Sequence, residues 1–286
     1  MADLRSLVAE ELSLPVDPRV TACASAIAVK HFPASRAVLF YGSCLRQQRL
    51  EGLMLDFYLI VSDYRATYGK RWLAAANRLI PPNVFYFEHE GLVAKYAVLS
   101  EADFHRLCGP ETSSVSVWAR FAQPSRLVWA ADDAASHRVI DSISLAAPTL
   151  LAAAGPQPRE EPLALWRRAF SLTYSAELRA ERAGRASSVV DLEPERYARF
   201  TAPALAAAAD MRPHSSWARR RIEGKTLSVV RLAKASLTFA GGADYIAWKI
   251  NRHAGTDIEL KPWQRRHPLL AGLSLLPRLL RSGAVR

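Results

Sequence analysis

Short apolar runs rich in β-branched and aromatic residues dominate the first hundred residues of the chain. Runs of this kind, when turn residues bound them, predict buried strands. They cover residues 37–41, 53–61, 84–87 and 92–99. Helical patterns at residues 22–31 and 72–80 lie between them, and an alternation of strands with helices predicts an α/β domain.

The texture of the sequence changes near Ser136, where it becomes rich in alanine and leucine. Helices are expected over residues 163–183, 227–239, 245–253 and 268–280, after a proline-containing link at residues 155–158. We therefore expect three parts: an α/β domain in residues 1–135, a mainly α-helical domain in residues 136–222, and a basic helical region in residues 223–286.

The excess of positive over negative charge is confined to the last quarter of the chain. The net charge is +11, and residues 212–286 hold fifteen Lys or Arg and only four acids, so this quarter carries the whole excess. Such a region suggests nucleic acid, a membrane surface or acidic substrates as partners. We do not expect nucleic acid as the partner, because the aromatic interleaving and the known modules that would support it are missing.

The last segment has the pattern of an amphipathic helix. Residues 261–286 carry six basic and no acidic residues, and four leucines fall on one helical face: Leu269, Leu273, Leu276 and Leu280. Arg278 and Arg281 would flank that face, and Trp263 suits the headgroup level of a bilayer. The alternative is a helix that packs on the protein's own core.

A glycine–serine pair and a lone aspartate carry the clearest chemistry. Gly42 and Ser43 follow the first predicted strand directly, and Asp56 lies inside the second apolar run. Glycine lets backbone N–H groups approach phosphate oxygens closely, and a carboxylate is costly to bury unless it is paired or binds a cation such as Mg²⁺. The alternative is an ordinary turn glycine with an acid at a strand edge.

This arrangement resembles the nucleotidyltransferases of the polymerase-β type, in which Gly-Ser holds phosphates and strand carboxylates hold a catalytic metal. Most of them carry Asp-x-Asp or Asp-x-Glu on the second strand, whereas this chain has Tyr58 at the second position. Asp63, Glu88 and Glu90 are candidates for the missing metal ligand, although an ordinary solvated loop acid is the favoured interpretation of each.

Further motifs resemble the mitochondrial translocator assembly and maintenance proteins, which are CDP-diacylglycerol synthases with a single strand aspartate. In chain order the similar segments are Tyr41-Gly-Ser-Cys-Leu-Arg-Gln-Gln48, Met54-Leu-Asp-Phe, Lys95-Tyr-Ala-Val-Leu-Ser100, Ala119-Arg-Phe-Ala-Gln-Pro124 and Ser171-Leu-Thr-Tyr-Ser-Ala-Glu-Leu-Arg179. Lys234, Tyr245 and Lys249 follow the C-terminal pattern of that family. Gln123 stands where the family has a lysine.

The resemblance implies a polymerase-β-like nucleotidyltransferase domain in residues 1–135 and a Mg²⁺-dependent reaction of CTP with phosphatidate that yields CDP-diacylglycerol and pyrophosphate. It implies catalytic roles for Asp56 and Lys95, with Asp56 and more weakly Glu88 as Mg²⁺ ligands. Nucleotide contacts would come from Gly42, Ser43, Gln48 and Arg120, and lipid or membrane contacts from Lys234, Lys249, Trp263, Arg278 and Arg281. Lys95 and Arg120 could instead be solvated surface cations.

The partners implied are CTP, phosphatidate and an anionic membrane surface. We expect a cytoplasmic protein associated peripherally with the inner face of the membrane, since three cysteines without zinc or disulfide spacing favour a reducing compartment. Two other hypotheses remain open at this point. One is a nucleotidyltransferase that modifies RNA or a small molecule, and the other is an inactive membrane-associated scaffold.

Overall fold

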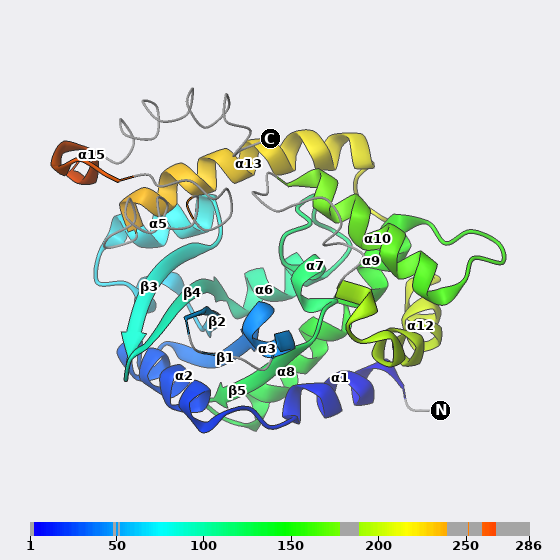
Figure 1. Cartoon of the computed structure of the whole chain (residues 1–286), viewed down its shortest axis with the longest axis horizontal. Coiled ribbons are helices and arrows are strands. Elements are labelled where there is room, and N and C mark those ends of the chain that lie inside the picture. The colour runs from blue at the N-terminus through cyan, green and yellow to red at the C-terminus, as the bar shows by residue number, and fades with distance from the viewer. Residues whose placement is uncertain are drawn as a thin grey trace.

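A five-stranded mixed sheet forms the centre of the sheet-bearing half of the molecule (Figure 1). The structure is a computed structural model that describes residues 3–47, 50, 52–177, 189–238, 251 and 259–266. The strand order is β3-β4-β2-β1-β5. β2 and β4 are parallel and the other neighbours are antiparallel. The strands are β1 Ser35–Tyr41, β2 Met54–Val61, β3 Asn83–His89, β4 Leu92–Ser100 and β5 Ser125–Ala130.

Helices cover both faces of this sheet. Those before β5 are α1 Leu4–Ser13, α2 Pro18–Lys30, α3 Ser43–Gln47, α4 Tyr64–Thr67, α5 Arg71–Leu79, α6 Glu101–Cys108 and α7 Trp118–Phe121. Those after it are α8 Asp133–Ser144, α9 Ala146–Ala154, α10 Pro162–Ala176, α12 Pro194–Ala208, α13 Trp217–Thr238 and α15 Pro262–Arg266. The mixed α/β class expected from the sequence is confirmed.

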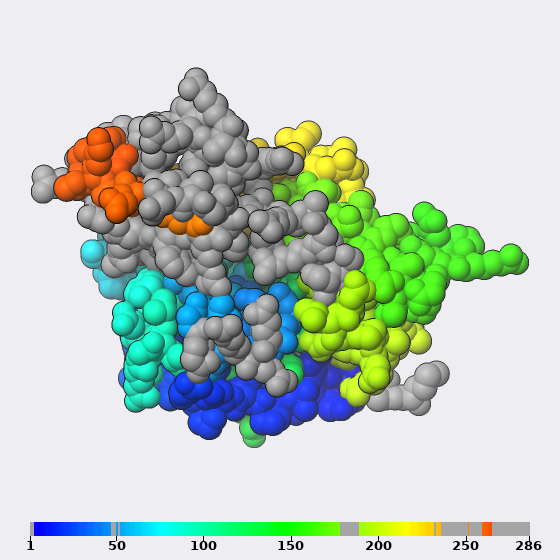
Figure 2. Space-filling model, in the orientation of Figure 1, coloured from blue at the N-terminus to red at the C-terminus, as the bar shows by residue number. Residues whose placement is uncertain are grey.

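The period-two alternation of the strands divides the core into two clusters. Leu39, Tyr58 and Leu99 point to the face that α1, α6 to α10 and α12 cover. Phe40 and Phe57 point to the other face, where α2 supplies half of the buried residues that lie outside the strands. The first cluster contains residues from both sides of position 135, and Figure 2 shows the two halves adjoining on the surface as well.

The four strands expected from the sequence are confirmed within one or two residues at most ends, and so is the helix at residues 71–79. The helix expected over residues 22–31 begins earlier, at Pro18, because Asp17 caps it and proline occupies its first position. The strand β5 and the helix α1 were not expected. The helices expected over 245–253 and 268–280 lie outside the described residues, apart from Asn251.

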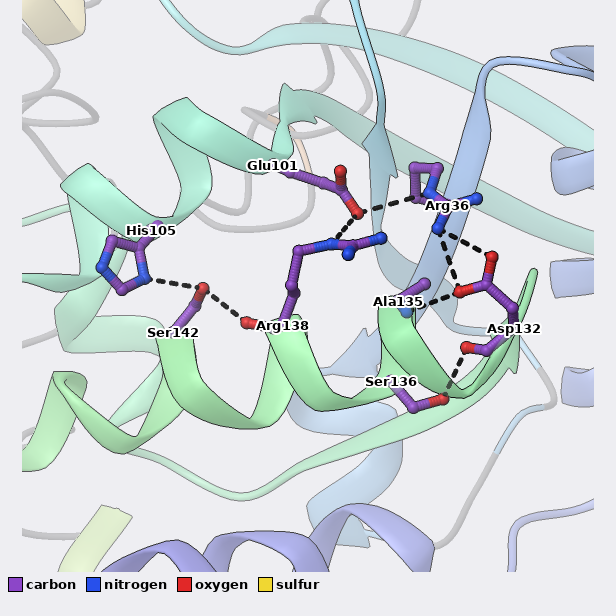
Figure 3. Close-up of polar contacts among 8 residues, drawn as sticks. All are labelled: Arg36, Glu101, His105, Asp132, Ala135, Ser136, Arg138 and Ser142. Carbon is purple, nitrogen blue, oxygen red and sulfur yellow. Dashed lines mark hydrogen bonds and ion pairs between the residues drawn. The ribbon is translucent and has the colours of Figure 1, made fainter.

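A polar network ties the start of β1 to two helices (Figure 3). Arg36 of β1 donates to Glu101 in the first turn of α6 and to Asp132, which caps α8. Arg138 of α8 donates to the same Glu101 carboxylate at 2.8 Å. This network holds the end of β1 that lies away from Gly42, so it supports the sheet and leaves the other end for different chemistry.

The helix α13 runs along the side of the molecule from α10 to α5 and β3 (Figure 1). Its closest approach to α10 is at Gly224, where an added Cβ would lie 2.1 Å from the backbone oxygen of Ala176. Only glycine allows the two backbones to come so near. Among the described residues, no helix is both long enough and apolar enough to cross a membrane.

Candidate functional site

The glycine–serine turn lies directly against the strand aspartate. Gly42 follows β1 with a φ of +94°, a left-handed conformation that favours glycine. A Cβ at this position would lie 2.8 Å from Oδ2 of Asp56. Within the described part of the chain, the hydroxyl of Ser43 makes no hydrogen bond. The turn therefore presents a bare backbone and a free hydroxyl beside a carboxylate.

Asp56 and Lys95 form an ion pair across two parallel strands. They are register partners on β2 and β4, and Nζ of Lys95 lies 2.8 Å from Oδ1 of Asp56. The side chain of Lys95 is 26% exposed, and that of Asp56 is 16% exposed. Oδ1 is nevertheless buried and accepts no hydrogen bond of regular geometry from the described residues. The carboxylate can therefore still accept another ligand.

Tyr58 is a core residue. It occupies the position at which most nucleotidyltransferases of the resembled type carry a second carboxylate. It is 2% exposed, and its ring lies 5.2 Å from that of Phe121 and 5.3 Å from that of Tyr41. Burial raises the pKa of its hydroxyl, although nearby Arg120 and Arg231 act in the opposite direction. A carboxylate at this position would be buried under α7, which explains why an aromatic residue suits it.

Two arginines from separate helices lie close to this aromatic group. Arg120 of α7 donates to the backbone oxygen of Ser116. Burial alone would lower the pKa of Arg120, but nearby Tyr58, Glu177, Tyr41 and Asp56 raise it above its ordinary value. Arg120 therefore stays charged beside the carboxylate of Asp56.

Arg231 of α13 is the second of these arginines. Burial lowers its pKa, Arg120 lowers it further, and Glu177 and Tyr58 raise it. Arginine remains protonated even so. The sequence analysis did not single out Arg231, because only tertiary packing turns it inward.

Arg46 is another cation that the sequence analysis missed. It lies on α3, directly after the glycine–serine turn, and its Nη1 donates to Oε1 of Gln123 at 3.0 Å. Gln123 is fixed in turn by donating to the oxygen of Ala119 at 2.8 Å. Gln123 replaces a lysine of the resembled family, and Arg46 brings a positive charge to that place.

Glu88 does not lie beside Asp56. It is exposed on the edge strand β3, opposite Val93 of β4, and accepts a hydrogen bond from the hydroxyl of Tyr86. From the spacing of strands and residues, its Cα lies about 12 Å from that of Asp56. The structure therefore gives no support to Glu88 as a partner of Asp56 in holding a metal.

Lys234 is buried rather than exposed to a bilayer. It is 8% exposed, and its Nζ donates to the backbone oxygens of Ile80 and Pro82. Burial, and then the charge of Arg231, lower its pKa to about 7. Its place inside the protein does not suit the membrane contact expected of it.

The remaining membrane candidates fall mostly outside the description. Trp263 of α15 is 45% exposed. Lys249, Arg278 and Arg281 lie outside the described residues, as does the nucleotide-binding candidate Gln48.

The residues fit a magnesium ion only if the ion arrives with a polyphosphate. Within the described ranges, no three His, Cys, Asp or Glu side chains come together as a metal centre. Mg²⁺ commonly takes one or two carboxylates, several waters and the oxygens of a bound phosphate. Asp56, whose carboxylate pairs with Lys95 and borders the glycine–serine turn, suits that mode of binding and not a closed protein site.

Comparison with known proteins adds little to this geometry. No family model matches the sequence, and no curated protein matches it. A solved structure described as a nucleotidyltransferase-like protein from Exiguobacterium sibiricum is similar over 92% of each chain, with 10% identity and a TM-score of 0.30. A likeness at this level assigns neither fold nor activity, so the function has to be argued from the site.

Proposed function

We propose that the chain is a Mg²⁺-dependent nucleotidyltransferase. The observation that carries this proposal is the contact between Gly42 and Asp56, in which a tight turn after one strand brings bare backbone against a strand carboxylate. Such a turn admits phosphate oxygens, and the carboxylate beside it suits the cation that accompanies a nucleoside triphosphate.

The substrates we propose are CTP and phosphatidate, as the similarity to CDP-diacylglycerol synthases suggests. An oxygen of the lipid phosphate forms a bond to the α-phosphorus of CTP, and the bond from that phosphorus to the bridging oxygen of the β-phosphate breaks. Pyrophosphate leaves with the electron pair. The attacking oxygen of a phosphate dianion carries no proton, so the site needs charge neutralisation and alignment more than a general base.

The cations around the turn can supply that neutralisation. Backbone groups at Gly42 and Ser43 hold the departing pyrophosphate, with Arg46 of α3 beside them. Lys95 pairs with Asp56, and Arg120 is near enough to feel the charge of Asp56, so both suit the place where the attacking lipid phosphate would meet the α-phosphate. A bound Mg²⁺, held by Asp56, would neutralise further phosphate charge.

We propose that the protein binds to the surface of an anionic bilayer on its cytoplasmic side. The outer face of α13 exposes Ile222 by 70% and Val229 by 57%, and Lys225 is exposed between them. Apolar side chains beside a cation suit the boundary of an anionic membrane. The exposed Trp263 has the same character.

The transfer reaction is tested with labelled CTP, phosphatidate in detergent micelles and Mg²⁺. Label should appear in CDP-diacylglycerol, and Asp56→Asn should lower the rate at least ~100-fold, because it removes the charged metal ligand beside the glycine–serine turn. The matched control is Asp133→Asn, an exposed acid in the first turn of α8, which should keep the wild-type rate.

Undiminished transfer by the Asp56→Asn protein would reject this site. Transfer of label to RNA or to a small acceptor, with none to lipid, would keep the nucleotidyltransferase and reject phosphatidate. No affinity for CTP with Mg²⁺ would favour the inactive scaffold.

Membrane association is tested by sedimentation with vesicles of anionic lipid. The double variant Ile222→Glu, Val229→Glu and a protein that lacks residues 261–286 should each sediment less than wild type. Sedimentation of both at the wild-type level would reject the proposed membrane surface.

A further inference from the structure

Two segments, one between α6 and α7 and one between α5 and β3, hold the guanidinium of Arg231 on α13 in a fixed position. Nε of Arg231 donates to the oxygen of Pro81 at 2.9 Å. Its Nη1 lies 3.0 Å from Oγ of Ser116 and its Nη2 lies 3.5 Å from Oγ of Ser114. Three of its five donor hydrogens are thereby oriented, and two are left for another acceptor.

Arg120 approaches the same place from α7. It shares Ser116 with Arg231, since Arg120 donates to the backbone oxygen of Ser116 while Arg231 donates to its hydroxyl. In the described part of the chain, neither arginine has a carboxylate within ion-pair distance. Both side chains are partly accessible rather than sealed.

The local charge is positive. Arg120 and Arg231 are close enough for the charge of Arg120 to lower the pKa of Arg231, and Glu177 at the end of α10 raises the pKa of both. Two like charges that packing forces together are stabilised when an anion binds between them. Planar guanidinium groups with free parallel donors match the oxygens of a phosphate.

The position of the pair relative to Asp56 indicates which phosphate it would bind. Ser116 accepts hydrogen bonds from both Arg120 and Arg231, so the two guanidinium groups lie close together. Arg120 is also near enough to Tyr58 and Asp56 for their charges to raise its pKa. The arginine pair therefore adjoins the Asp56 end of the site. The glycine–serine turn contacts Asp56 itself, so the two ends of the site can hold two different anions.

We propose that Arg120 and Arg231, oriented by Ser114 and Ser116, form a second anion site that binds the phosphate monoester of the acceptor substrate. This inference rests on the proposed function, because it assigns the acceptor to one side of Asp56 and the triphosphate to the other. It makes Arg231 a substrate-binding residue that no sequence motif marks.

The experiment uses the full chain and dihexanoyl phosphatidate, a soluble phosphate monoester, without nucleotide. Calorimetric titration should show that Arg231→Gln weakens binding about tenfold, the loss expected of one charge-assisted hydrogen bond. Arg231→Lys should lose less, because it keeps the charge. The control is Arg221→Gln on the exposed face of the same helix, which should bind as wild type does.

A second measurement separates the acceptor from the nucleotide. In the transfer assay, Arg231→Gln should raise the KM for the short phosphatidate about tenfold and change the KM for CTP less than twofold. A larger effect on CTP would overturn the assignment. So would wild-type binding by Arg231→Gln, an equal loss in Arg221→Gln, or inorganic phosphate binding as tightly as the lipid.

The two proposals fail in different ways. If the protein transfers no nucleotide but Arg231→Gln loses lipid binding, the anion site stands and the proposed reaction falls. If Arg231→Gln does not fold, Ser116→Ala removes the hydroxyl that orients Arg231 while keeping its charge. That variant should weaken lipid binding in the same direction, and unchanged binding would overturn the site.

Discussion

Gly42 and Asp56 constrain each other at the scale of single residues. The glycine has a left-handed backbone, and the space that its missing Cβ leaves is filled by a carboxylate oxygen. Position 42 thus requires glycine for two separate reasons: its left-handed backbone conformation, and the closeness of the Asp56 carboxylate on the neighbouring strand.

Gly42→Ala should therefore damage both stability and activity. The left-handed conformation and the displaced carboxylate together predict a loss of about 1–3 kcal/mol in the free energy of unfolding. Urea denaturation measures that loss, and the transfer assay should show little activity because Asp56 has moved. Gly69→Ala, where a Cβ would meet nothing within 4 Å, is the control. Equal behaviour of the two variants would contradict the argument.

Lys234 predicts a stability that depends on pH. Its pKa is about 7 in the folded protein, lowered first by burial from an ordinary value of 10.5. Between these two values the unfolded chain binds more protons than the folded one, so stability rises with pH across that window. Lys234→Met removes this dependence.

The difference in unfolding free energy between wild type and Lys234→Met should thus shift in favour of wild type as the pH increases from 7 to 9.5. Urea denaturation at both values measures it. Lys225→Met, an exposed lysine of the same helix, should show no such shift. A difference independent of pH would refute the prediction.

The sequence could identify some site residues and not others. Gly42, Ser43 and Asp56 are recognisable because a glycine after an apolar run and a lone acid inside one are rare combinations that local chemistry explains. Arg46 and Arg231 look like any surface cation in the sequence. Their positions depend on Gln123, Ser114 and Ser116, which only tertiary packing brings to them.

At the scale of elements, α13 shows how packing extends a helix beyond its sequence signal. The apolar pattern predicts a helix from residue 227, but the helix begins at Trp217. Its first turns are held by Arg220, which is 1% exposed, donates to the oxygens of Thr112 and Ser113, and lies 5.6 Å from the ring of Trp118. Part of the basic excess is thus internal.

The strands were predictable for the opposite reason. The apolar runs of β1, β2 and β4 are largely buried and contribute to both core clusters, so composition alone marks them. The strand β5 was not predicted because it is short, its five residues after Ser125 are only partly buried, and its sequence mixes polar with apolar residues.

Gly224→Ala should disturb the crossing of α13 and α10. An added methyl group would overlap the backbone oxygen of Ala176, which cannot move away as a flexible side chain could. We expect a loss of about 1–3 kcal/mol from overpacking, despite the better helix propensity of alanine. Thermal unfolding measures this. The control is Thr226→Ala, an exposed position two residues further along α13, which should leave the stability nearly unchanged. A Gly224→Ala protein as stable as wild type would show that the two helices do not meet there.

At the scale of the whole molecule, the N-terminal helix joins the two halves. α1 packs against α8, β5 and α12, and one hydrophobic cluster extends from Leu4 to Ala204. The boundary expected after residue 135 falls within this shared core, so we expect the described halves to unfold together.

An ion pair between Glu11 of α1 and Arg196 of α12 tests that coupling. The side chains keep only 11% and 10% of their surface, and Arg196 also donates to the oxygen of Ala122 at 3.0 Å. Burial would lower the pKa of Arg196, and Glu11 with other neighbours raises it. Arginine remains protonated in proteins even without such a partner, so Arg196 stays charged when Glu11 is replaced. Glu11→Gln would leave that charge buried and uncompensated, which costs about 3 kcal/mol.

The neighbouring pair Glu10 and Arg199 provides the matched control. It joins the same two helices, but its side chains are 58% and 52% exposed, and exposed pairs contribute at most about 1 kcal/mol. Urea unfolding of Glu11→Gln should thus show a single transition at a clearly lower midpoint, while Glu10→Gln stays near wild type. If the Glu11→Gln protein instead unfolded in two transitions, and only the second had a lower urea midpoint, the sheet half and the helical half would unfold separately. In that case α1 would not couple them.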